Sequence, residues 1–369
     1  MIALRLPTWP PPGQALTAAA ERPRISTESR TGAASNTDLL RAGFVHPQPE
    51  TPMKVIFDTD PGIDDAIALF YLSRLPQLEL LGITTVVGNA DVDATTRNAL
   101  FLRQRFGLAA PVIRGAARAL DGVAPSYPTR IHGHNGLGDI PLPDSETAGL
   151  RPGSASQFII DTLRAHPGDV TLIAVGCLTN LALALRQAPD IAGLAKAIVI
   201  MGGAFGYQGR HGNVTPVAEA NIHGDPLAAD DVFAADWPVV VVGLDVTYDV
   251  VLSADYLAAL ARDAGENGKL IQDISAMYLR FYQETRGIDG VVGHDLLPVA
   301  YLVRPELFAT RSGPLCVVRE GIARGQTIQM PDTQRQPLAP WRDRRSQLIC
   351  TGVDGDAVLA HYWDSVTAR

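Results

Sequence analysis

The feature that most constrains the fold is a series of strongly apolar segments separated by segments with helical spacing. The apolar segments are "KVIFD", "LELLGITTVVG", "VTLIAVG", "AKAIVIMGG" and "PVVVVGLD", and they begin at Lys54. Strands that are apolar on both faces are typical of the interior of a mainly parallel sheet whose two faces are covered by helices. The sequence therefore predicts an α/β fold.

Helical spacing predicts the elements between these strands. We expect helices over Asp64–Leu75, over Asp91–Phe106 and over "LTNLALALRQA". Residues 253–312 are expected to be mostly helical, and "SQLICTGVDGDAVLAHYWDSV" to form a final strand and helix. No internal repeat or linker divides the chain after residue 53, so we predict a single large doubly wound, mainly parallel sheet flanked by helices.

Composition limits the class of protein and of partner. The 369 residues are 46% hydrophobic and 19% charged, which suffices for a large core. The net charge is -8 and the basic residues are scattered, so we expect no nucleic acid or anionic membrane as partner. No apolar run reaches the ~18 residues of a membrane span. The three cysteines contain no CxxC pair, which favours neither a zinc cluster nor a disulfide framework and fits the cytoplasm.

The N-terminal segment differs from the rest. Residues 1–52 are rich in Pro, Ser, Thr and Ala and lack a sustained period, and "TWPPPG" interrupts any apolar run of a signal peptide. Met53 stands immediately before the first strand and is itself a candidate start of translation. We therefore predict that residues 1–52 are a disordered or mis-started extension and that residues 53–369 form the functional domain.

Four carboxylates follow the first apolar strand in the stretch "VIFDTDPGIDDA", namely Asp58, Asp60, Asp64 and Asp65. The loops at the carboxyl ends of parallel strands form the site in open sheets, and this motif is placed at such an end. Stabilisation of a helix N-terminus by acids explains one or two of the four. Crowding at a buried strand end would raise their pKa values unless a cation kept them ionised. An oxygen-only cluster selects Ca²⁺ or Mg²⁺ over zinc.

Polar side chains also follow other predicted strands. They are Asn89, then Asn213, Glu219 and Asn221 in "GNVTPVAEAN", and His294 and Asp295 in "GHDLLPVAY". Amides and carboxylates of this kind can bind the hydroxyls of a sugar. Each taken alone is also explained as a turn or cap residue, and the last pair as a surface histidine beside an N-cap aspartate.

Together these motifs resemble the nucleoside hydrolase family, the inosine-uridine-preferring N-ribohydrolases. The stretch from Asp58 to Ala66 is similar to the family's signature, and "VVGN", "VGCLTNLA", "IVIMGG", "GNVTPVAEAN" and "HDLLPVAY" follow in the family's order. The resemblance covers the chain from Met53 to the C-terminus. It implies calcium-dependent hydrolysis of the N-glycosidic bond of ribonucleosides, by attack of a metal-bound water through an oxocarbenium-like transition state, giving ribose and free base.

The resemblance also implies roles for individual residues. Ca²⁺ would be held by the side chains of Asp60, Asp65 and Asp295 and by the backbone carbonyl of Val175. Asp60 would also be the general base, and His294 would protonate or orient the departing base. Asp58 would support the metal site from behind. The sugar would be held at its 2′- and 3′-hydroxyls by Asp64, Asn89, Glu219 and Asn221, and near its 5′ end by Asn213 and Met201.

Two stretches bear on the base. "RIHGHNGLGD" is a Gly-rich loop similar to the family's base-side lid, with His132 the better candidate for a contact and His134 the weaker. Tyr278 and Tyr282 are four residues apart on one helical face and could cover a nucleobase, although ordinary helix packing explains them equally well. The resemblance implies a small-molecule ribonucleoside as substrate and a homodimer or homotetramer, and leaves the choice between purine and pyrimidine open.

Two other classes of function remain open at this stage. "VIFDTD" also resembles the first motif of haloacid-dehalogenase-type phosphatases, but that class needs a downstream Lys, and Lys196 and Lys269 lie in no convincing strand-end motif. The second alternative is a non-catalytic sugar- or nucleoside-binding protein. Loss of Asp60 or of the metal ligands would favour it, and all of them are present.

Overall fold

The structure is a computed structural model that describes residues 51–123, 126–143, 147–334 and 338–368. The predicted N-terminal extension lies outside the described residues up to residue 50, so it stays a prediction. Among the described residues, no helix is both long and apolar enough to cross a membrane.

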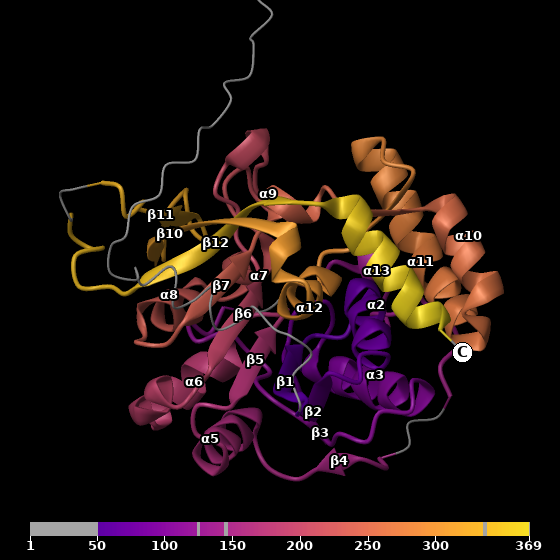
Figure 1. Cartoon of the computed structure of the whole chain (residues 1–369), viewed down its shortest axis with the longest axis horizontal. Coiled ribbons are helices and arrows are strands. Elements are labelled where there is room, and N and C mark those ends of the chain that lie inside the picture. Colours follow the sequence, from indigo (N-terminus) through magenta and orange to yellow (C-terminus); the bar gives the residue numbers. More distant parts are fainter. Residues whose placement is uncertain (1–50, 124–125, 144–146, 335–337, 369) are drawn as a thin grey trace, which may run out of the picture.

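A ten-stranded sheet forms the centre of the described chain (Figure 1). Neighbouring strands run parallel from β12 through to β4, while β10 pairs antiparallel with both β12 and β11. The mainly parallel α/β prediction is therefore confirmed. In sheet order the strands are β11 (Thr327–Gln329), β10 (Phe308–Val317), β12 (Ser346–Val353), β7 (Val239–Val242), β6 (Ala197–Met201), β5 (Val170–Ala174), β1 (Met53–Thr59), β2 (Leu78–Thr85), β3 (Val112–Ile113) and β4 (Leu150–Arg151).

The chain winds outward from β1 in both directions, with β2 on one side and β5 on the other. The point between β1 and β5 is a topological switch point, where open parallel sheets form their ligand crevices at the carboxyl ends of the strands. The two predicted features that most bear on function, the Asp-rich motif after β1 and Val175 after β5, are therefore brought to this point.

Helices cover both faces of the sheet, as Figure 1 shows. One face packs against α2 (Ile63–Leu72), α3 (Val92–Arg105), α11 (Gly265–Arg286), α12 (Leu296–Val303) and α13 (Gly355–Thr367). The other packs against α5 (Ala155–Ala165), α6 (Thr179–Gln187) and α8 (Pro226–Ala234). The remaining elements are α4 (Thr129–His132), α7 (Ala220–Gly224), α9 (Leu244–Thr247), α10 (Ala254–Asp263), the strands β8 (Val251–Ser253) and β9 (Gly290–Val292), and the 3₁₀ helices Pro189–Gly193, Tyr207–Gly209 and Pro305–Leu307.

Successive residues of the central strands supply two separate cores. Val55 and Phe57 of β1 belong to the core beneath α2 and α12, while Ile56 between them belongs to the core beneath α5 and α6. This alternation follows from the pleat, which points neighbouring side chains to opposite faces. Because both faces are covered, both sets must be apolar, which is why these strands lack the polar alternation of a half-exposed sheet.

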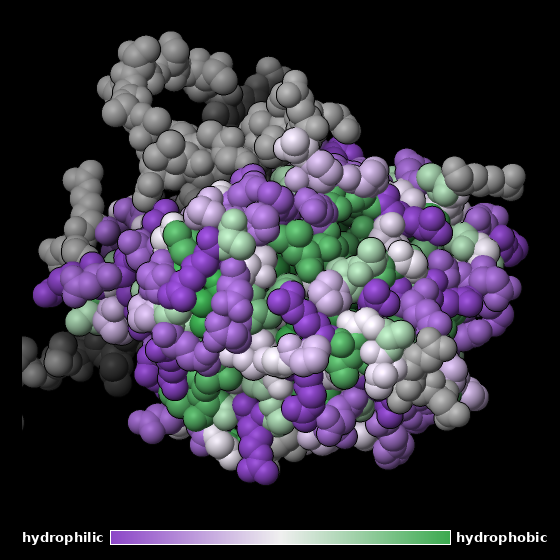
Figure 2. All heavy atoms as spheres, turned by 90° about the horizontal axis from the view of Figure 1, so that it is seen from below, coloured by the Kyte–Doolittle hydropathy of each residue, from purple (hydrophilic) through white to green (hydrophobic). Residues whose placement is uncertain are grey.

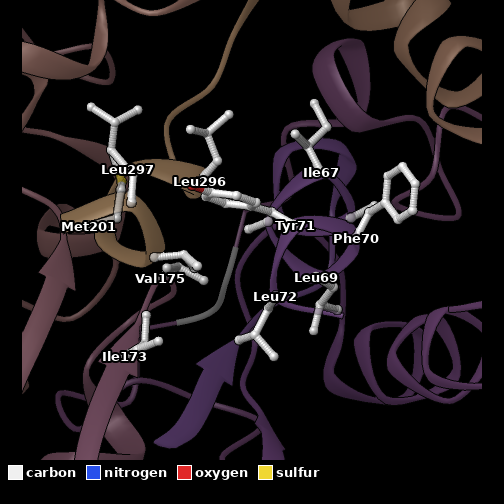
Figure 3. Close-up of a cluster of buried hydrophobic side chains, with 14 of the residues drawn as sticks. Ile67, Leu69, Phe70, Tyr71, Leu72, Ile173, Val175, Met201, Leu296 and Leu297 are labelled. Carbon is white, nitrogen blue, oxygen red and sulfur yellow. The ribbon is translucent and has the colours of Figure 1, made fainter. Parts of the chain in front are cut away.

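The core nearest the strand ends is formed where α2 and α12 meet the sheet. Figure 3 shows Leu296 and Leu297 of α12 in the same cluster as Val175 and Met201, which follow or end β5 and β6, with Tyr71 of α2 beside them. All five are at most 3% exposed. This apolar packing fixes the positions of the segments that carry the polar residues described below.

The prediction that residues 253–312 are mostly helical is confirmed, and two strands interrupt or follow the helices. Gly290–Val292 is β9, which pairs antiparallel with β8, and Phe308 begins β10. Short apolar runs do not distinguish strand from buried helix, and here pairing with a distant partner decides. The β8–β9 pair matters for the site, because β9 ends two residues before His294.

The large exposed hydrophobic side chains are dispersed among the described residues. They come from separate segments and comprise Val123, Tyr127, Leu150, Val214, Ile322 and Leu338. On the face drawn in Figure 2, hydrophobic patches are interrupted by hydrophilic side chains. Scattered apolar residues of this kind are ordinary on a protein surface.

Candidate active site

Asp60 lies between two glycines at the end of β1. A β-carbon built on Gly88 would stand 1.9 Å from Asp60 Oδ2, and one on Gly176 would stand 2.7 Å from Asp60 Oδ1. The backbone amide of Asn89 donates a hydrogen bond to Asp60 Oδ2 at 2.8 Å. Asp60 Oδ1 is buried and has no hydrogen-bond partner among the described residues. The carboxylate is thus held on one side and free on the other.

Asp65 is held by the turn between β1 and α2. Its Oδ2 accepts hydrogen bonds from the Gly62 amide at 2.8 Å and from Asn89 Nδ2 at 3.1 Å, and its Oδ1 accepts one from the Thr59 hydroxyl. The helix-capping explanation is therefore correct in part, because Asp65 caps the backbone at the start of α2. Asn89 joins Asp60 to Asp65, one through its backbone and the other through its side chain.

Three buried carboxylates converge beside this turn. Oxygens of Asp64, Asp65 and Asp295 all lie within 4.8 Å of one another. This trio differs from the predicted metal ligands in one member, since Asp64 takes part and Asp60 does not. Asp64 Oδ1 is buried without a hydrogen-bond partner among the described residues. Asp295, which precedes α12, makes no side-chain hydrogen bond to cap that helix, so the N-cap explanation fails for it.

Asp60 and the trio of Asp64, Asp65 and Asp295 together form the acid cluster, and burial raises the pKa of each of these four acids. For Asp60, Asp64 and Asp295 the charges of neighbouring carboxylates add to the effect of burial and place the pKa well above its ordinary value. For Asp65 burial also raises the pKa, and the hydrogen bonds from Thr59 and Gly62 oppose this rise. No salt bridge among the described residues involves these four acids. Oxygen-only donors, two of them unpaired, fit a hard divalent cation.

Asp58 lies within β1, two residues before Asp60, and is fully buried. Its Oδ1 accepts hydrogen bonds from the Thr84 hydroxyl and from Asn180 Nδ2. Burial raises the pKa of Asp58 to about 7, against these two hydrogen bonds, which lower it. Asn180 also donates to the carbonyl of Thr85 at 2.9 Å, so Asp58 ties β1 to β2 and α6.

The ends of β5 and β6 meet at Asn221. Asn221 Nδ2 donates to the Val175 carbonyl at 2.9 Å and to the Met201 carbonyl at 3.2 Å. Glu219, 1% exposed, accepts hydrogen bonds from the backbone amides of Gly203, Asn221 and Ile222. The Val175 carbonyl predicted as a metal ligand is thus engaged by an amide. Asn213 is exposed, and no hydrogen bond joins its side chain to another described residue.

A row of aromatic side chains faces the acid cluster from α11 and its neighbours. Tyr278 and Tyr282 are both buried, with their hydroxyl oxygens 3.2 Å apart. The Tyr282 hydroxyl is 2.7 Å from His294 Nε2, and the Thr247 hydroxyl is 2.8 Å from His294 Nδ1. His294 is 4% exposed, so the explanation as a surface histidine is wrong.

His132 joins this row from the loop of residues 130–139. Its ring centroid is 5.4 Å from that of Tyr278, and its Nδ1 accepts a hydrogen bond from the Ile63 amide at 3.2 Å. Burial lowers the pKa of His132 to about 3, so the ring is neutral. His134 is exposed. Of the two histidines, His132 is the one that lies at the site.

Residues that sequence reasoning missed complete the row. Tyr248 is edge-on to His294, with ring centroids 5.4 Å apart. The guanidinium groups of Arg210 and Arg286 lie 5.5 Å and 5.6 Å from the Tyr248 ring centroid. The rule that found Asn89 would also have found Thr247 and Tyr248, which follow β7 in "GLDVTYD". Arg286 continues the spacing of four from Tyr278 and Tyr282.

Residues 55–360 match the family model described as "Inosine-uridine preferring nucleoside hydrolase". The chain belongs to this family. It is 40% identical over 310 residues to Uridine nucleosidase 1 of Arabidopsis thaliana, covering 84% of this chain and 91% of the relative. The family's chemistry makes this chain a glycosidase, an N-ribohydrolase that acts on ribonucleosides.

Solved structures of nucleoside hydrolases share the fold. The plant nucleoside hydrolase PpNRh1 superposes with a TM-score of 0.82 at 33% identity, covering 86% of this chain and 100% of the other. A purine-preferring ribonucleoside hydrolase from Gardnerella vaginalis gives a TM-score of 0.78 at 34% identity, covering 85% and 98%. The names of these similar proteins include both a uridine and a purine specificity.

Proposed function

We propose that this nucleoside hydrolase cleaves the N-glycosidic bond of ribonucleosides in a calcium-dependent reaction, with uridine the first substrate to test. The observation that carries the proposal is the cluster of buried acids with two unpaired oxygens, on Asp60 and Asp64. So many buried carboxylates without a cationic partner are costly to keep ionised, and a divalent cation removes that cost. The 40% identity to a uridine nucleosidase supports the choice of uridine.

The residues that would hold Ca²⁺ are Asp60, Asp65, Asp295 and the Val175 carbonyl, with Asp64 close enough to Asp65 and Asp295 to take part. A bound Ca²⁺ supplies a water of lowered pKa and a common anchor for that water and the sugar hydroxyls. The Val175 carbonyl oxygen has two lone pairs, so one can accept the hydrogen bond from Asn221 while the other faces the cation.

Asp60 is the general base in this proposal. Its Oδ2 is fixed by the Asn89 amide while Oδ1 is free of hydrogen bonds, so Oδ1 is the atom that accepts the proton from water. The water's oxygen forms the new bond to the anomeric carbon as the bond to the base nitrogen breaks. Asp64, Asn89, Glu219 and Asn221 hold the ribose hydroxyls, and the negative charge of Asp64 and Glu219 stabilises the oxocarbenium-like transition state.

The departing base takes the electron pair of the broken bond and needs a proton or a positive charge. His294 stands between the Thr247 and Tyr282 hydroxyls, which fix the orientation of its ring. In this proposal the hydrogen-bonded pair of His294 Nε2 and the Tyr282 hydroxyl donates one proton to the base nitrogen, and solvent returns a proton to the pair after the base has left. Tyr278 and His132 line the same side of the site as His294, and in this proposal their rings contact the face of the base.

We also propose a cytoplasmic location for the protein. The three cysteines are free and buried, which is in keeping with a reducing cytoplasm. A homodimer or homotetramer remains the proposed assembly. The phosphatase alternative loses support because Lys269 is paired with Asp273 on the surface of α11 and Lys196 lies immediately before β6, at the opposite end of that strand from the site.

The test is release of ribose by the purified protein from uridine, inosine, cytidine and adenosine, compared with the Asp60→Asn variant. The wild-type protein should release reducing sugar without release of phosphate, and the variant should lose about 10³-fold in kcat with an unchanged fold by circular dichroism. Tight binding of nucleosides without ribose release would instead support the non-catalytic binding protein. Near-normal turnover by Asp60→Asn would contradict the role of Asp60.

A further inference from the structure

One face of α11 carries a residue of the site in each of three successive turns. Tyr278, Tyr282 and Arg286 are spaced by four residues, which places them in one row along the helix. The two tyrosines are buried and joined to His294 by hydrogen bonds. Arg286 is exposed and stands in the last turn, just before the left-handed Gly287 that ends the helix. The row therefore leads from the buried site to its solvent-exposed rim.

Tyr248 connects Arg286 to the catalytic side chains. The Arg286 guanidinium lies 5.6 Å from the Tyr248 ring centroid, and the edge of the same ring contacts His294. Arg210 lies over Tyr248 as well, at 5.5 Å, but its charge is already paired with Asp249 at 2.7 Å. Arg286 forms no salt bridge or hydrogen bond with another described residue. Its five N–H donors are therefore available to a ligand.

The positive charge of Arg286 acts electrostatically on two hydroxyl groups of the site. Burial raises the pKa of Tyr248 and of Tyr282, and the positive charge of Arg286 opposes that rise at both hydroxyls. Tyr282 is the residue whose hydroxyl contacts His294 Nε2. A group that interacts electrostatically with these hydroxyls also lies within range of a base bound against them.

The chemistry of the leaving base decides what such a cation can do. Uracil and hypoxanthine leave with negative charge spread onto carbonyl oxygens, which accept hydrogen bonds from a guanidinium. Cytosine and adenine carry an amino group at the corresponding ring position, and an amino group is a donor that an arginine cannot bind. An uncommitted arginine beside the base therefore discriminates between oxo and amino bases.

We propose that Arg286 is a specificity-determining residue that favours leaving bases with a carbonyl oxygen at the position where cytosine and adenine carry their amino group, uridine over cytidine and inosine over adenosine. Arg286 stabilises the charge that develops on that oxygen as the glycosidic bond breaks. This inference rests on the proposed nucleoside hydrolysis and adds the recognition of the base to it.

The experiment compares kcat/KM for the four nucleosides in wild-type protein, Arg286→Gln, Arg286→Lys and the control Arg280→Gln. Arg280 is an exposed arginine on the same helix and lies off the row, so its loss changes the net charge equally. Arg286→Gln should lower the uridine-to-cytidine and inosine-to-adenosine ratios by at least about tenfold, as loss of a charged hydrogen bond predicts. Arg286→Lys should restore part of each ratio, and Arg280→Gln should leave both unchanged.

The outcomes separate the inference from the function on which it rests. Equal losses on all four nucleosides, or no loss on any, would overturn the role of Arg286 in base selection while leaving the hydrolase intact. A nitrophenyl riboside, whose leaving group carries no base carbonyl, should be hydrolysed by Arg286→Gln nearly as well as by wild type. Wild-type protein that releases ribose from none of these substrates would contradict the proposed function itself, and the inference with it.

Discussion

The carboxylate of Asp60 lies directly against Gly88, so that a β-carbon at Gly88 would stand 1.9 Å from Asp60 Oδ2. Only a residue without a side chain leaves room for the proposed general base at this point. The same approach positions the neighbouring Asn89 amide to hold Oδ2. The glycine is therefore part of the site's geometry although it bears no functional group.

Gly88→Ala should lower kcat about 10²-fold without unfolding the protein. The added methyl group must displace the Asp60 side chain or the loop after β2, and a shift of about 1 Å at a catalytic group costs about 10²-fold in rate. Steady-state kinetics with uridine and a thermal unfolding curve measure the two effects. Gly193→Ala is the matched control, because a β-carbon there meets nothing within 4 Å. Unchanged kcat in Gly88→Ala would mean that Asp60 is not held as described.

His294→Ala should impair natural nucleosides more than an activated substrate. Without His294 the departing base loses the group that the Thr247 and Tyr282 hydroxyls hold in place, and kcat for uridine should fall about 10²-fold. A nitrophenyl riboside needs no protonation of its leaving group, so its turnover should fall far less. His134→Ala, a change of an exposed histidine on the base-side loop, is the control. Equal losses on both substrates would remove His294 as the residue that assists the leaving base.

Asp230 should make an acid-sensitive contribution to stability. It is 3% exposed and accepts hydrogen bonds from Arg344 at 2.7 Å, from Arg319 at 2.8 Å and from the Val317 amide at 2.9 Å. Burial alone would raise the pKa of Asp230, but these bonds outweigh it and the pKa is lowered. Because the folded pKa lies below the unfolded value, the stabilisation is present above the ordinary aspartate pKa of about 3.9 and is lost as the pH falls through the lower folded value.

Urea unfolding of Asp230→Asn at pH 7 should therefore show a loss of about 3 kcal/mol, typical of a broken buried pair. The difference from wild type should shrink as the pH falls below about 3.9. Asp190→Asn, which breaks a pair with Arg164 whose side chains are 56% and 50% exposed, should cost less than about 1 kcal/mol. A loss of the same size in both variants would contradict the importance of burial at Asp230.

The elements of the sheet could be predicted because burial on both faces leaves a local signal. Each central strand is a continuous apolar run, and the polar residue that ends it stands out from that run, as Asn89 does. The first apolar run likewise predicts where β1 ends, and Asp60 and Asp65 follow directly after that end, at the switch point. These features depend on neighbours in the sequence, so a single sequence contains them.

Contacts between distant segments could not be predicted in the same way. His294 and Thr247 are separated by 47 positions and meet only because β9 pairs with β8 after the end of β7. The exchange of Asp64 for Asp60 in the closest carboxylate trio depends on side-chain directions in the first turn of α2. Asn213 was predicted at the site from its motif, but in the structure it is exposed on a loop. Loops have no helical or strand period, so the sequence does not indicate which way a loop side chain points.

The measurement that tests the central claim most directly is ribose release from uridine by the full-length protein before chelation, after exhaustive chelation and after re-addition of Ca²⁺. Chelation should abolish ribose release and Ca²⁺ should restore it, because the cluster of Asp60, Asp64, Asp65 and Asp295 needs a cation to function. Ribose release that continues unchanged in protein shown by elemental analysis to be free of metal would contradict calcium dependence.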